Sequence, residues 1–153
     1  MAVLVVAGSA LLSCAARAAE VPPLLPGRVA SVAGTHISCA AGKTSVTCKK
    51  VHGLTATIVQ TGVVHVTRDS RRLTSTAKPR VLHDYDGFNI VGTKGVGIYC
   101  HVYVAGKPTL NCSLDDTSLV HDSQGFDMTE SSVVVFRYDR SGGRHSVRTV
   151  RQP

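Results

Sequence analysis

Two stretches of the chain follow one pattern: Gly42-Lys43-Thr44-Ser45-Val46-Thr47-Cys48 and Gly106-Lys107-Pro108-Thr109-Leu110-Asn111-Cys112. An earlier cysteine precedes each stretch, Cys39 in the first and Cys100 in the second. Cys100 and Cys112 are equidistant from Gly106, and Cys39 and Cys48 are equidistant from the Lys43–Thr44 bond. An antiparallel hairpin would place each pair opposite each other, with Cα atoms about 4.5–5.5 Å apart, within disulfide range. The spacing therefore predicts two stapled β-hairpins, with disulfides Cys39–Cys48 and Cys100–Cys112.

The similarity continues beyond the cysteines. Gly53–Thr57 resembles Gly125–Thr129, and a Val-rich run ending in Arg68 or Arg137 follows each. Short Val- and Thr-rich runs separated by turn formers favour strands over helices. We expect strands at Arg28–Val32, Thr35–Ala40, Ser45–Lys49, Leu54–Gln60, Val63–Thr67, Asn89–Thr93, Gly97–Val104, Thr109–Leu114, Phe126–Thr129, Val133–Tyr138 and His145–Val150. The predicted fold is all-β: two tandem related units of short antiparallel strands, each with a disulfide-stapled β-hairpin, packed as a sandwich or open barrel.

The N-terminal residues indicate export. Residues 2–16 carry no charge, and the apolar run is shorter than the roughly 20 residues that a membrane-spanning helix needs. Small residues in Ala16-Arg17-Ala18 are typical of a cleavage site, so residues 1–18 are predicted to be an export signal peptide. Leu11-Leu12-Ser13-Cys14 supports an alternative, a lipoprotein signal that ends before Cys14 and leaves the protein lipid-anchored through that residue.

The remaining chain divides into a first β unit (19–68), a basic linker (69–80) and a second β unit with a basic C-terminal hairpin (81–153). Four cysteines remain in both processed forms, an even number that favours disulfides in an exported chain. The expected location is secreted or periplasmic, with no integral membrane span in the mature chain.

The positive charge is unevenly distributed. The whole chain has 17 Lys and Arg against 10 Asp and Glu, and basic residues concentrate in residues 68–80 and in the C-terminal tail. Such segments favour an anionic surface or polymer as partner. The predicted contact surface consists of Arg71, Arg72, Arg144, Arg148 and Arg151. The alternative is that these cations simply keep the surface solvated.

Motifs for metal or nucleotide chemistry are incomplete. Gly42-Lys43-Thr44 lacks the glycine that a P-loop needs five residues earlier, where Ile37 stands. Two zinc sets can be assembled, Cys39, Cys48 and His52, and Cys100, Cys112 and His121, but each lacks a fourth ligand. Asp84-Tyr85-Asp86-Gly87 is typical of an Asx turn rather than a calcium loop. We therefore assign no metal ligands, no cofactor and no catalytic residues.

The order Ile-x-Cys, (Val/Leu)-x-Cys, then Gly-(Phe/Leu) and a Val-rich strand resembles small secreted bacterial disulfide-containing domains of unknown function. The resemblance covers residues 34–68 and 95–137 and implies no activity. We expect an exported, non-catalytic binding module of the cell envelope or extracellular space, with an anionic partner or a secreted protein as its target.

Two alternatives stay open. The stapled hairpins could present the tips Gly42–Ser45 and Gly106–Pro108 as a secreted enzyme inhibitor, because rigid loops bind at low entropic cost. A small secreted hydrolase would instead need histidines and an aspartate to converge in one pocket. The acidic segment 113–124 has no counterpart in the first unit, so an acquired activity would be sought there.

Overall fold

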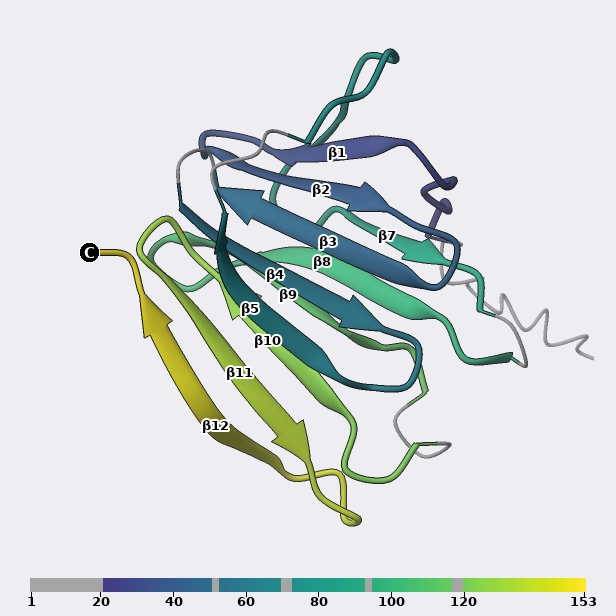
Figure 1. The fold of residues 1–153 in the computed structure, drawn as a ribbon, viewed down its shortest axis with the longest axis vertical. Helices are drawn as coiled ribbons and strands as arrows, with labels where there is room; N and C mark the ends of the chain where they lie inside the picture. The colour runs from purple at the N-terminus through teal and green to yellow at the C-terminus, as the bar shows by residue number, and fades with distance from the viewer. Residues whose placement is uncertain (1–20, 51–52, 70–72, 93–94, 117–119) are drawn as a thin grey trace, which may run out of the picture.

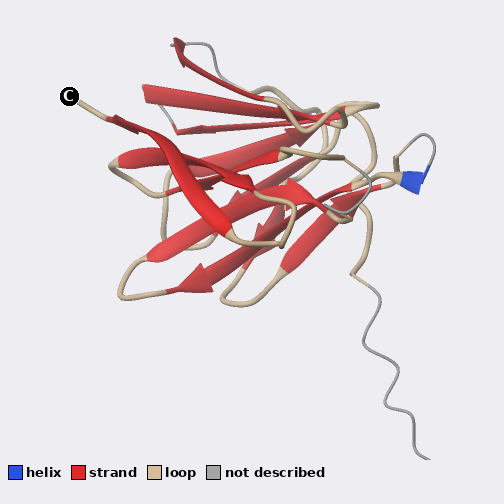
Figure 2. Cartoon of the chain, turned by 90° about the horizontal axis from the view of Figure 1, so that it is seen from below, coloured by secondary structure: helices blue, strands red, loops and turns tan. Residues whose placement is uncertain are grey.

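The computed structural model describes residues 21–50, 53–69, 73–92, 95–116 and 120–153. It contains two six-stranded sheets packed face to face as a sandwich (Figures 1 and 2). Sheet 1 contains β1 (Val29–Val32), β2 (Ile37–Ala41), β3 (Ser45–Lys50), β4 (Gly53–Val59), β5 (Val64–Asp69) and β6 (Arg80–Leu82). Sheet 2 contains β7 (Gly87–Ile90), β8 (Ile98–Val104), β9 (Pro108–Leu114), β10 (Gln124–Met128), β11 (Ser132–Tyr138) and β12 (Arg144–Arg151). The predicted all-β sandwich is confirmed.

Both predicted disulfides are present. Cys39 and Cys48 face each other across β2 and β3, and Cys100 and Cys112 do the same across β8 and β9. Their Cα atoms are 4.0 and 4.2 Å apart, close to the spacing of about 4.5 Å in a non-hydrogen-bonded antiparallel pair. The hairpin between β8 and β9 turns at Gly106, whose φ of 82° is one that glycine adopts without strain.

The two units have the same topology. Strands β1 to β5 form an antiparallel meander, and β7 to β11 form a second meander with the same neighbour order. The sixth strand differs, because β6 is added beside β1 whereas β12 is added beside β11. The similarity between the two units therefore extends from the cysteines to five strands of each sheet.

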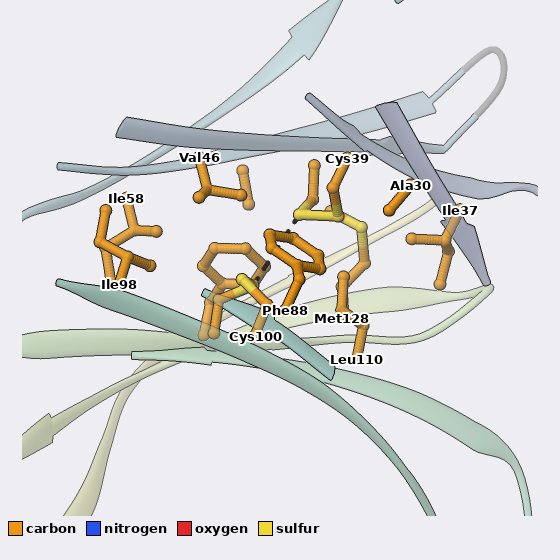
Figure 3. Packing of buried hydrophobic residues seen from close by; sticks show 14 of the residues in the cluster. Ala30, Ile37, Cys39, Val46, Ile58, Phe88, Ile98, Cys100, Leu110 and Met128 are labelled. Carbon is orange, nitrogen blue, oxygen red and sulfur yellow. Dashed lines mark hydrogen bonds between the residues drawn. A yellow bond between two sulfur atoms is a disulfide. The ribbon is translucent and has the colours of Figure 1, made fainter. Parts of the chain in front are cut away.

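The inner faces of the two sheets form one core. Figure 3 shows Val46 and Ile58 from sheet 1 facing Phe88, Ile98 and the Cys100 sulfur from sheet 2. All these side chains are fully buried. Burying aliphatic side chains of this kind contributes about 1.5–3 kcal/mol each before chain entropy is counted. The described buried residues of both sheets form a single cluster, so the two units fold against each other.

The units are related by an approximate two-fold arrangement. Cys48 and Cys112, the second cysteine of each unit, meet at the centre of the core with their Sγ atoms 3.9 Å apart. Strand β4 contacts β10 and β11, and its counterpart β10 contacts β4 and β5. Equivalent residues meet in this way when two copies of one surface pack on each other about a two-fold axis.

Each unit also sends an arm across to the other. The segment before the second meander, which we call the second arm, forms β6. This strand pairs in parallel with β1, with Ser31 opposite Val81. The segment before the first meander, which we call the first arm, forms a parallel bridge to β7, with Pro23 opposite Asn89. Pro23 precedes Ser31 by eight positions, as Val81 precedes Asn89. The two arms are therefore equivalent segments exchanged between the units.

Sequence reasoning did not find this exchange. The predicted basic linker, 69–80, ends at Arg80, which is the first residue of β6 and belongs to sheet 1. Strand β6 has three residues and follows Pro79, so no alternation marks it as a strand. Within the residues that the structure describes, no helix is long and apolar enough to cross a membrane. The predicted signal, residues 1–18 with Cys14, lies outside the described residues.

Candidate functional site

Part of the predicted anionic-partner surface lies at one edge of the sandwich. Arg148 and Arg151 lie on β12, the outermost strand of sheet 2, and every residue of this strand except Val150 is exposed. Figure 1 shows β12 at the rim of the molecule, next to β11. Arg71 and Arg72 lie outside the described residues.

The C-terminal end of β12, in sheet 2, lies next to the C-terminal end of β5, in sheet 1. Val150 packs against the core, and Arg148 shares its face of β12 because alternate residues of a strand point the same way. On β5, Val66 packs against the core and Arg68 shares its face. The Arg68 guanidinium donates to the backbone oxygen of Arg151 at 3.3 Å. Strands from the two units thus meet at this edge, and we call Arg68, Arg148 and Arg151 the basic edge.

Compensating acids are sparse at the basic edge. No described acidic side chain pairs with Arg148 or Arg151. The nearby Asp69 lies 3.9 Å from the Lys49 ammonium, which is itself buried. Because charges of one sign at an exposed edge add their fields, the basic edge is a region of positive potential.

Arg144, the remaining predicted contact residue, has a different environment. Its guanidinium pairs with Asp127 and lies over the Phe136 ring, 3.6 Å from the centroid. Asp127 also accepts a 2.8 Å hydrogen bond from the Asn111 amide, and both of these side chains are largely buried. Arg144 therefore anchors β12 to the outer face of sheet 2.

Two aromatic side chains of β8 complete this outer-face network, which we define as His101, Tyr103, Asn111, Asp127 and Arg144. Burial raises the pKa of Tyr103, and the negative charge and hydrogen bonding of Asp127 raise it further. Burial lowers the pKa of His101 and outweighs the opposing effect of Asp127. His101 Nδ1 is buried without a hydrogen-bond partner among the described residues. The network joins four strands across sheet 2, and its carboxylate is already engaged by its neighbours.

This network could not be assembled from the sequence. His101, Asn111 and Asp127 are opposed in register on β8, β9 and β10, although up to 26 positions separate them in the chain. The register between β9 and β10 depends on the connection within the 113–124 segment, whose sequence carries no turn motif of fixed length. An alternating polar pattern on β8 and β9 was the available signal.

Two other histidines form separate surface contacts. His36 Nδ1 lies 3.3 Å from Glu130 Oε1, and His145 Nε2 lies 2.8 Å from Asp139 Oδ2. The Asp139 carboxylate accepts hydrogen bonds from the Ser141 hydroxyl and from the His145 ring. These hydrogen bonds hold the pKa of Asp139 far below its usual range. Each of these described pairs uses a different carboxylate, at a different place in the fold. The convergence of histidines that a hydrolase needs is not seen among them.

The four core cysteines are all in disulfide bonds. Three of their sulfurs, from Cys48, Cys100 and Cys112, lie within 4.8 Å of one another. Zinc binds thiolates, whereas the Cys48 sulfur is bonded to Cys39 and the Cys100 sulfur to Cys112. The second zinc set also needed His121, which is exposed on the loop before β10, and His52 lies outside the described residues. Two disulfides are compatible with an extracellular or periplasmic location.

The predicted inhibitor tips lie at the hairpin turns. Lys43 and Lys107 are both exposed there. No family model, curated protein or solved structure matches this chain. Its function must therefore be argued from the geometry of its own residues.

Proposed function

We propose that the protein is an exported, non-catalytic binding module of the cell envelope or extracellular space that holds an anionic polymer or surface at the basic edge. One observation carries this proposal: Arg148 and Arg151 are exposed on an edge strand, beside Arg68 of the other unit, with no acidic partner among the described residues. Residues 1–18, as an export signal, would deliver the chain to the compartment in which its disulfides form.

Electrostatics sets the expected strength of this interaction. Each Lys or Arg near an anionic surface contributes about 1 kcal/mol, and salt screens the effect over a Debye length of about 10 Å at 0.1 M. Removing two arginines should therefore cost about 2 kcal/mol, or roughly 20–30-fold in affinity. Binding should also weaken steadily as salt increases.

Protection of the sheet edge is the competing role for these arginines. Charged side chains on edge strands prevent two sheets from pairing. Under that reading, neutralising Arg148 and Arg151 would promote self-association and leave polyanion binding unchanged. The two roles therefore predict different measurements on the same variant.

Retention on a sulfated-polysaccharide resin tests the proposal. The variant R148Q/R151Q should elute at lower salt than the wild type, and adding R71Q and R72Q tests the rest of the predicted surface. The control K43Q/K107Q removes the same charge from the hairpin tips and should elute close to the wild type. Equal elution of R148Q/R151Q and K43Q/K107Q would mean that net charge alone governs retention, and the basic edge would be rejected. Light scattering on the same samples detects self-association.

A further inference from the structure

The exchanged arms meet at a cleft of about 230 Å³. It is lined by Leu24, Leu25, Arg28 and Val29 from the first arm and the start of β1, and by Lys78 and Arg80 from the second arm. The cleft lies beside β1 and β6, at the opposite end of sheet 1 from β5 and therefore from the basic edge.

One cation of the cleft is held in place before any ligand arrives. The Arg80 guanidinium donates to the backbone oxygen of Pro22 at 3.1 Å and to that of Gly87 at 2.7 Å. These two carbonyls belong to the first arm and to β7, so Arg80 is fixed where the arms cross. A guanidinium has five N–H donors, so the two bonds leave others for an anion. Fixing a charged group in advance reduces the entropy lost on binding.

The other two cations are available. Arg28 and Lys78 are exposed, and no described acidic side chain pairs with either. None of the described residues lining the cleft is acidic. Three positive charges around one small cleft favour an anionic group.

The rest of the cleft is apolar. Leu24 and Val29 are buried beneath it, whereas Leu25 is 61% exposed beside the arginines. An exposed leucine loses contact with water when an alkyl group covers it, at about 25 cal/mol per Å² buried. Leu25 therefore favours a ligand that has an apolar part next to its charge.

We propose that this cleft binds a small amphiphilic carboxylate, with its charge on Arg28, Lys78 and Arg80 and its alkyl chain on Leu25. Its volume equals that of about eight waters at ~30 Å³ each, which corresponds to a ligand of about eight non-hydrogen atoms, the size of hexanoate. Pockets for drug-sized ligands are larger, about 300–1,000 Å³. This site goes beyond the polyanion binding proposed above and uses different residues.

Titration of the ¹⁵N-labelled protein tests the proposal, with hexanoate as the probe and the amides of Leu24, Leu25 and Val29 as reporters. Hexanoate should produce saturable shifts at these amides. Hexanol lacks the charge and acetate lacks the chain, so each should bind at least about tenfold more weakly. Equal affinity for hexanol and hexanoate would overturn the charge assignment, and equal affinity for acetate would overturn the apolar one.

Variants separate this cleft from general electrostatics. R28Q/K78Q should weaken hexanoate at least about tenfold, whereas K43Q/K107Q and R148Q/R151Q, which remove equal charge elsewhere, should bind as the wild type does. Loss of hexanoate binding in all three would show a net-charge effect and contradict the site. If R28Q/K78Q fails to fold, L25S provides the second test, because an exposed leucine tolerates replacement. L25S should weaken hexanoate and leave the weak acetate binding unchanged; unchanged hexanoate binding would reject the site.

Discussion

Truncating the buried leucine of either exchanged arm should destabilise the whole protein. Leu24 is 5% exposed, and Leu82 is fully buried in the shared core. A buried leucine truncated to alanine costs about 2–5 kcal/mol, because the apolar transfer energy is lost and a cavity remains. We expect L24A and L82A each to lower the free energy of unfolding by about 3 kcal/mol. The same cost in both arms would follow from their equivalent positions.

Leu25 provides the matched control in the same arm. It is adjacent to Leu24 and chemically identical, but it is 61% exposed. Surface substitutions of this kind usually change stability by no more than about 0.5 kcal/mol. L25A should therefore unfold close to the wild type, and a large difference between L24A and L25A would report docking of the arm.

Urea denaturation followed by circular dichroism measures these differences. With a slope of about 1–3 kcal/mol per M, a loss of 3 kcal/mol lowers the midpoint by about 1–3 M. A single transition shared by both units is expected, since neither has a core of its own. If L24A unfolds within about 0.5 kcal/mol of the wild type while L82A does not, the first arm is not docked in solution and the exchange is wrong.

Three further predictions concern the core and the outer-face network. Replacing Cys39 and Cys48, or Cys100 and Cys112, by alanine should cost about 2.5–3 kcal/mol in each case, and an unchanged urea midpoint would mean that the staples do not restrict the unfolded chain. R144Q should destabilise the protein by about 1–2 kcal/mol because Asp127 loses its ionic partner, and adding D127N should recover part of that loss; strictly additive costs in the double variant would show that the two side chains are uncoupled. Burial lowers the pKa of His101 in the folded protein, so protonation of this side chain favours the unfolded state. The contribution of His101 to the free energy of unfolding is therefore complete above the unfolded pKa of about 6.5, and it is lost as the pH falls through that value towards the folded pKa. H101Q should therefore show a flatter stability profile between pH 7 and pH 5 than the wild type, and identical profiles would assign the pH dependence to other groups.

The local features of the fold could be predicted from the sequence. Cysteines equidistant from a turn fix their own pairing, so Cys39–Cys48 and Cys100–Cys112 followed from spacing alone. The other strands of the two meanders follow the same logic, except for the register between β9 and β10, since adjacent strands joined by short turns need no long-range information. Predicted and observed strand ends agree to within a few residues.

The long-range features could not be predicted. The first arm contains Pro22 and Pro23 and resembles a linker, yet Leu24 donates its backbone N–H to the Asn89 oxygen at 2.8 Å. Parallel pairing of an arm with the other unit depends on how the sheets pack, which no local pattern records. The bulge between Val135 and Phe136 has a similar effect on β12. It shifts the register of this strand between Ser146 and Arg148, so Arg144 and Arg148 lie on opposite faces of β12, although simple alternation over four positions would place them on the same face.

Mapping the bound polyanion on the ¹⁵N-labelled protein is the most direct test of the proposed function. A short sulfated oligosaccharide should shift the amides of Arg148, Val150 and Arg68 saturably, and these shifts should diminish as salt is added. The hairpin tips at Lys43 and Lys107 should change little. Shifts concentrated at those tips, or spread evenly over all exposed cations, would contradict binding at the basic edge.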